Sequence, residues 1–269
     1  MKFKKEIEAL RLIDDDFMCM VFEDARCCQE VLGIILDKKD LIIKETDIHR
    51  EIKNIANERS VVLDVFATDS EGKKYNIEVQ RNNSGAIPQR ARYYSSIIDV
   101  SMTFEGESYK DIAESYVVFI TENDVLAGGL PIYHIERVIR ETNQLFNDKE
   151  HIVYVNASMR YGESELERLM HDFYCTSPKD IHNKEIARQV TYFKESEEGK
   201  FKMCKIMEDI KNQGIEQGIE QGIEQGIEKG KKEFVINLFN DGTTDILKIS
   251  KLVGLPKEKV EEILKQREK

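Results

Sequence analysis

Two acids and an amide, Asp64, Glu78 and Gln80, are the residues whose types and spacing could support metal-assisted chemistry. They lie in residues 61–80, VVLDVFATDSEGKKYNIEVQ, where two runs of β-branched and aromatic residues flank a turn. This pattern predicts a β-hairpin. A three-residue loop over 70–72, with glycine in its left-handed third position, closes such a hairpin. In the register that this loop imposes, Asp64 faces Glu78, and both share a face with Gln80.

Two carboxylates in facing positions repel each other, because cross-strand Cβ atoms lie about 5 Å apart. The repulsion is relieved where both reach water, where one is protonated, or where a cation lies between them. Mg²⁺ takes one or two carboxylates and adds water and phosphate oxygens, and Gln80 could hydrogen-bond such a water. The alternative is a surface face that happens to carry acids, and a one-residue error in the turn would separate the two carboxylates. The other face is expected to be the core-facing one, with Leu63, Val65, Tyr75, Ile77 and Val79.

The order of these residues resembles the core motif of the PD-(D/E)xK nuclease superfamily, with glutamine in the place of its lysine. The surrounding sequence is similar to the Rpn branch, the recombination-promoting nucleases or putative transposases. The residues that carry this similarity are YNIEVQ at 75–80, PQRARYY at 88–94 and VVFI at 117–120. The resemblance covers residues 14–185. It implies an α/β fold of the restriction-endonuclease type, with a mixed central sheet flanked by helices.

The resemblance also implies a metal site and a reaction. Asp64, Glu78 and the backbone carbonyl of Val79 are expected to hold Mg²⁺, or Mn²⁺ or Ca²⁺ in its place, with Asp64, Glu78 and Gln80 as the catalytic residues. In the parent motif the lysine positions or polarises the attacking water. Gln80 can orient that water, but it carries no charge and cannot act as a base. We therefore expect a metal-dependent DNA endonuclease, and the alternative is a non-catalytic DNA- or protein-binding module with a degenerate nuclease fold.

A helix is predicted over residues 89–104, directly after the hairpin. Gln89 and Tyr93 lie on one stripe of it, whereas Arg90 points to a different side. The resemblance implies that this helix packs on the sheet behind the metal. Gln89 and Tyr93 would then approach the site, and Arg90 or Arg92 could contact a phosphate. The alternative for both arginines is an ordinary helix surface.

One amphipathic helix or two are predicted over residues 14–37. Some nucleases of the superfamily place a further acid on this helix. Asp16, Glu23, Asp24 and Glu30 are the candidates here, and the sequence does not choose among them.

The remaining elements of the first domain follow from shorter patterns. A short strand at 41–43 and a polar connection to 57, with His49 on the surface, are predicted before the hairpin. Apolar runs predict buried strands at 115–121 and 151–157, and alternation favours a strand at 131–138. Helices are predicted at 163–173 and 179–195, so residues 1–198 are expected to form the nuclease-like domain.

The last third of the chain has a different organisation. Residues 214–229 repeat a four-residue unit, GIEQ GIEQ GIEQ GIEK, within a segment, 199–232, that is predicted as a helix or a linker. Residues 233–269 are predicted as a small helical unit with helix–turn–helix spacing, in which Thr243 or Thr244 caps a helix and positions 246, 249, 252, 253 and 260 form a core. This unit could bind DNA or form a helical hairpin for dimerisation. A homodimer through the C-terminal region is therefore expected.

Composition sets limits on these functions. The chain has 40 Lys and Arg against 51 Asp and Glu, a net charge of −11, which predicts weak and salt-sensitive DNA binding unless metal ions contribute. Its five cysteines lack paired spacing and are expected to be reduced thiols in a cytoplasmic protein. The basic first residues are followed by acids rather than by the apolar run of a secretory signal. No apolar stretch reaches the length of about 18 residues that a membrane helix needs.

Overall fold

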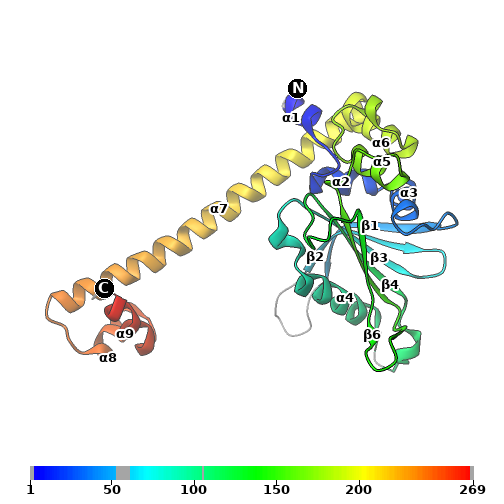
Figure 1. The fold of residues 1–269 in the computed structure, drawn as a ribbon. Helices are drawn as coiled ribbons and strands as arrows, with labels where there is room; N and C mark the ends of the chain where they lie inside the picture. Colours follow the sequence, from blue (N-terminus) through cyan, green and yellow to red (C-terminus); the bar gives the residue numbers. More distant parts are fainter. Residues whose placement is uncertain (1–2, 53–60, 105, 267–269) are drawn as a thin grey trace. The chain divides into compact units, whose positions relative to one another are not determined.

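The protein is described by a computed structural model covering residues 3–52, 61–104 and 106–266. The chain divides into two compact units, residues 1–204 and 205–269. In the described part of the first unit, the strands form a six-stranded sheet with the order β1-β2-β3-β4-β8-β5 (Figure 1). These strands are β1 (Ile43–Ile52), β2 (Val61–Asp69), β3 (Lys74–Gln80), β4 (Ser115–Thr121), β5 (Ile132–Ile135) and β8 (Glu150–Asn156).

The sheet is mixed, as predicted. Strands β1, β2 and β3 are antiparallel neighbours, β3, β4 and β8 are parallel, and β5 returns antiparallel to β8. Every residue of β4 is buried, as the apolar run at 115–121 predicted. The strand predicted at 131–138 is split into β5 and β6 (Val138–Ile139), and β6 pairs with β7 (Gln144–Leu145) in a separate ribbon.

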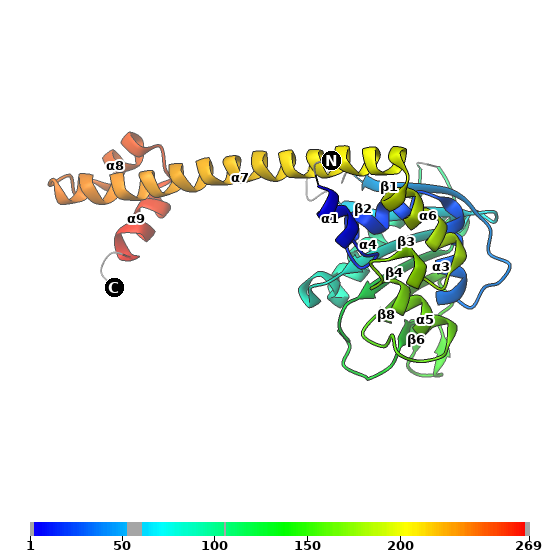
Figure 2. The ribbon, with the colours of Figure 1, turned by 90° about the horizontal axis from the view of Figure 1, so that it is seen from above.

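Helices cover both faces of the sheet. Helix α4 (Pro88–Met102) packs on one face, where Tyr94 stacks on Phe119 and Phe119 stacks on Tyr154. Figure 2 shows α3 and α6 on the other side of the strands from α4. Helices α3 (Ala25–Ile35) and α6 (Lys184–Glu195) pack together with α2 (Asp15–Phe22) and α5 (Glu165–Asp172). The short α1 (Lys4–Ala9) precedes them in the chain. The predicted α/β fold is confirmed, and the stretch at 14–37 forms two helices.

One expectation about the sheet is wrong. The strand that was placed at 41–43 is instead the ten-residue β1, which pairs with β2 along its length. Its side chains are mostly polar and partly exposed, so apolar periodicity could not indicate a strand there; His49 within it is exposed, as predicted. Residues 53–57 of the predicted connection lie outside the described residues. The expected core-facing residues of the hairpin are buried, and the alternative of a surface face for the acids is excluded, because Glu78 and Asn76 are both 0% exposed.

The second unit contains most of α7 (Glu197–Asn240), together with α8 (Ile246–Val253) and α9 (Lys257–Gln266). The GIEQ repeats lie within α7, and both predicted boundaries, after 198 and after 232, also fall inside this helix. Asp245, rather than a threonine, caps α8 by accepting the N–H groups of Leu247 and Lys248. Leu252 was expected in the core but is 56% exposed. Among the described residues, no helix is long and apolar enough to cross a membrane.

Candidate active site

The candidate site lies at the place where β2 and β3 separate, beside Asp64 and Glu78, and we call this place the fork. Phe66 pairs with Asn76 and the loop glycine Gly72 has a φ of 85°, so the predicted register and loop are confirmed. The described pairing of the two strands ends at Val65 and Ile77. Asp64 and Glu78 are therefore the first residues beyond the last pair, and the strands separate there instead of continuing the ladder that the sequence predicted.

The two acids hold the fork together through each other's backbone. The Asp64 carboxylate accepts the Val79 N–H at 3.2 Å, and the Glu78 carboxylate accepts the Asp64 N–H at 3.2 Å. Asn76 donates its side-chain amide to the same Glu78 oxygen at 3.1 Å. Each carboxylate thus replaces a missing ladder bond, which fixes its position at the fork.

Burial dominates the electrostatics of this pair. It raises the pKa of the Asp64 carboxyl, against a lowering by the Val79 N–H, and the nearby Asp15 raises it further. Burial also raises the pKa of Glu78, and the negative charge of Asp64 is the next cause. The raised pKa values favour a bound proton on this pair near neutral pH, and a cation between the two acids would favour their ionised forms instead.

Arg90 is the positive group that the fold brings to these acids. Its guanidinium lies 3.4 Å from a Glu78 oxygen and 3.4 Å from the Gln80 side-chain oxygen. Its Nε donates to the Tyr94 hydroxyl at 2.8 Å. The sequence expectation that Arg90 points away from the Gln89 stripe is correct, but the site lies on Arg90's side of the helix.

Gln80 is held close to the loop that follows β3. The segment Asn83–Ala86 forms a 3₁₀ turn over it, and a Cβ atom on Gly85 would lie 1.9 Å from the Gln80 side-chain oxygen. Only a residue without a side chain leaves room for the amide in this position. The Gly85 backbone and Arg90 together determine where the Gln80 amide lies.

The other residues expected near the site lie elsewhere. Gln89 and Arg92 are exposed on α4. Tyr93 is partly buried and packs against the hydrophobic cluster beneath the helix. The side of α4 that carries Gln89 and Tyr93 therefore does not face the acids. The sequence could not predict this, because tertiary packing sets how the helix is rotated about its axis.

Two acids at the start of α2, Asp15 and Asp16, lie near the site, and Asp16 is one of the four predicted N-terminal candidates. Asp15 and Asp16 both raise the pKa of Asp64 through their charge. Of the other three candidates, Glu23 pairs with Lys202, Asp24 pairs with Arg26 and Arg188, and Glu30 accepts a bond from Asn183. Asp15 was not among the sequence candidates, because its approach to Asp64 depends on how α2 packs against the sheet.

The residues at the fork fit a hard divalent ion. The described hydrogen bonds to Asp64 engage only one of its carboxylate oxygens. The backbone of Gln80 faces β4, because Glu122 donates its N–H to the Gln80 carbonyl at 3.0 Å. Backbone groups alternate sides along a strand, so the Val79 N–H and carbonyl both face the Asp64 side. Carboxylate and carbonyl oxygens suit Mg²⁺, which completes its coordination with water.

Comparison with known proteins places this chain in a family. The family described as PD-(D/E)XK nuclease family transposase matches residues 23–205, which is more than half of the chain and includes the whole fork. Searches of curated proteins and of solved structures returned no match. PD-(D/E)XK nucleases generally use divalent metal ions, which agrees with the ligand set at the fork. The chain belongs to the PD-(D/E)XK nuclease family of transposases.

Proposed function

We propose that this protein is a metal-dependent endonuclease that hydrolyses phosphodiester bonds in DNA, with a recombination-promoting or transposase-like role. The observation that carries the proposal is the pair of buried acids at the β2–β3 fork. Burial raises the pKa of both, and the Val79 carbonyl faces the same space. A buried pair of acids costs the fold stability, and perturbed pKa values of this kind cluster at functional sites.

In this proposal Asp64, Glu78 and the Val79 carbonyl hold the ion, which is Mg²⁺ or, in its place, Mn²⁺ or Ca²⁺. Such an ion supplies a water nucleophile at neutral pH and stabilises charge on the leaving oxygen. Gln80 orients the attacking water through its amide, which can donate and accept hydrogen bonds but cannot take a proton.

Arg90 supplies the positive charge that the family motif places on a lysine. Its guanidinium contacts both Glu78 and Gln80, so it holds the ligand and the water-orienting amide in one arrangement. Its charge also lies where a phosphate would approach the acids, and a guanidinium suits phosphate oxygens. Arg92, exposed on the same helix, is proposed as a second phosphate contact.

Cleavage of supercoiled plasmid by the full chain tests this function. We expect nicking with Mg²⁺ or Mn²⁺ and none with EDTA, and we expect Asp64→Asn and Glu78→Gln to abolish it. Asp111→Asn is the matched control, because it makes the same change at an exposed site. A folded protein that binds DNA but cuts under none of these conditions would favour the non-catalytic binding module. Parallel RNA substrates would establish the nucleic-acid class.

We further propose a homodimer formed through α7. Four isoleucines of the repeats, Ile215, Ile219, Ile223 and Ile227, are each 50–58% exposed. Sedimentation of the full chain beside Ile219→Lys and Ile223→Lys tests this, and a monomer at all concentrations would contradict it. We also propose a cytoplasmic location, which agrees with five cysteines that form no disulfide within the described residues.

A further inference from the structure

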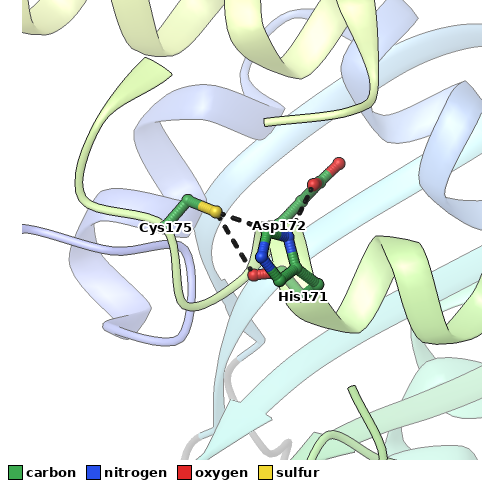
Figure 3. Close-up of side chains that lie close together, drawn as sticks. All are labelled: His171, Asp172 and Cys175. Carbon is green, nitrogen blue, oxygen red and sulfur yellow. Dashed lines mark hydrogen bonds and ion pairs between the residues drawn. The ribbon is translucent and has the colours of Figure 1, made fainter. Parts of the chain in front are cut away.

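Three metal-ligating side chains meet where α5 ends, in a part of the fold that the proposed nuclease reaction does not use. They are His171, Asp172 and Cys175 (Figure 3). The His171 Nδ1 atom lies 3.5 Å from the Cys175 sulfur and 3.5 Å from an Asp172 oxygen. The three ligand atoms all lie within 4.8 Å of one another.

These separations match a tetrahedral ion. Zinc binds nitrogen and oxygen at about 2.0–2.2 Å and sulfur at about 2.3 Å, so neighbouring ligands of a tetrahedral site are roughly 3.3–3.8 Å apart. Both measured distances from His171 fall in that interval. His171 and Cys175 are four residues apart, the spacing that brings two side chains to one face of a helical turn.

Asp172 is held in place by the loop before α6. Its side chain is 1% exposed and accepts the backbone N–H groups of His182 at 2.8 Å and Asn183 at 2.9 Å. The His182 ring also contacts it, with Nδ1 at 2.9 Å. Among its described partners none carries a permanent positive charge, which leaves a buried carboxylate to be balanced in another way. Ligand orientation by such outer hydrogen bonds is a regular feature of metal sites.

We propose that His171, Asp172 and Cys175 form a second metal site, for Zn²⁺ or another borderline-soft divalent ion. Nitrogen and thiolate ligands select such ions, whereas the all-oxygen fork selects Mg²⁺. Three protein ligands leave one position of the tetrahedron for water. An open recess of about 500 Å³, which both His171 and His182 line, gives solvent access to that position.

Metal binding at this site is coupled to proton release. Burial raises the pKa of the Cys175 thiol to about 11, and the charges of Asp172 and Asp180 add to the increase. Without metal the sulfur is therefore a thiol, which points at the carbonyls of His171 and Asp180. On binding, the thiol proton passes to solvent and the thiolate becomes a ligand. The ion would connect the last turn of α5 to the segment that directly follows it.

Titration of the metal-free full chain with Co²⁺ tests this site. Tetrahedral Co²⁺ bound to a thiolate gives a sulfur-to-cobalt charge-transfer band in the near ultraviolet. We expect one equivalent to produce this band and Zn²⁺ to remove it. Cys175→Ser and His171→Gln should abolish the band, whereas Cys204→Ser should retain it. Asp64→Asn should also retain it, so the result does not depend on the proposed nuclease site.

A band that survives Cys175→Ser, or no band in the wild-type chain, would overturn the proposal. Alkylation of the wild-type chain covers the case in which the variants fail to fold. We expect Zn²⁺ to slow iodoacetamide labelling of Cys175 by roughly tenfold or more, because a bound thiolate is not free to attack. Labelling of Cys204 should not change. Equal labelling of Cys175 with and without Zn²⁺ would refute the site.

Discussion

Replacing Asp64 by asparagine removes one negative charge from the fork and keeps an oxygen to accept the Val79 N–H. We expect this change to stabilise the metal-free protein at pH 8. Burial raises the folded-state pKa of both Asp64 and Glu78, so the folded chain binds more protons than the unfolded chain as the pH rises above about 4. The contribution of these acids to stability is therefore complete below pH 4 and is lost as the pH rises through their folded pKa values.

The magnitude follows from the charge separation. Facing residues on neighbouring strands lie about 5 Å apart. At that distance, with an effective dielectric constant of about 20, two charges repel by about 3 kcal/mol. Arg90, at 3.4 Å from Glu78, offsets part of this repulsion. We therefore expect Asp64→Asn to raise the free energy of unfolding at pH 8 by roughly 1–3 kcal/mol in the absence of metal.

Urea unfolding followed by tyrosine fluorescence is the assay. All ten tyrosines precede residue 205 and the chain has no tryptophan, so the signal reports the first unit alone. The gain should disappear at pH 4, where both acids are neutral. Mg²⁺ at about 100 times its Kd should add about 2.7 kcal/mol to the wild-type chain and nothing to the variant. Equal effects of Asp64→Asn and the exposed control Asp111→Asn at pH 8 would refute the reasoning.

Three further substitutions test other parts of the account. Arg90→Met should lower the cleavage rate by roughly 100-fold, because it removes the only described positive group that contacts Glu78 and Gln80, and Arg90→Lys should recover part of that loss in the plasmid assay. Gly85→Ala should slow cleavage by displacing the Gln80 amide, with a urea midpoint close to wild type; an unchanged rate would exclude a role for that amide. Lys194→Met should cost about 2–3 kcal/mol of unfolding free energy, because the buried ammonium donates to three backbone carbonyls that would lose their partner, and a change below about 0.5 kcal/mol would contradict this.

The hairpin was predictable because its signals are local. A glycine at the left-handed loop position and strict alternation fix the register, and Phe66 pairs with Asn76 as expected. The buried strands β4 and β8 follow from their apolar runs for the same reason. Strand β1 was missed because its side chains are polar and partly exposed, so its pairing with β2 leaves no periodic trace in the sequence.

The rest of the site depends on packing between distant segments. The rotation of α4 about its axis decides that Arg90, and not Gln89, contacts the acids. The separation of β2 and β3 after Val65 is also a tertiary property, which turns a predicted ladder pair into two carboxylates that bind backbone N–H groups. His171 and Cys175 carry no paired-cysteine spacing, and the loop before α6 is needed to orient Asp172 beside them.

The metal preference of cleavage by Asp64→Cys tests the central claim most directly, that Asp64 is a metal ligand in the reaction. A thiolate in this position favours softer ions over Mg²⁺. The measurement is the ratio of the plasmid-nicking rate with Cd²⁺ to the rate with Mg²⁺, for the variant and for the wild-type chain. Direct ligation predicts a ratio that rises sharply in the variant, through loss of the Mg²⁺ rate and partial recovery with Cd²⁺. Mg²⁺-dependent nicking at the wild-type rate, with an unchanged ratio, would contradict it.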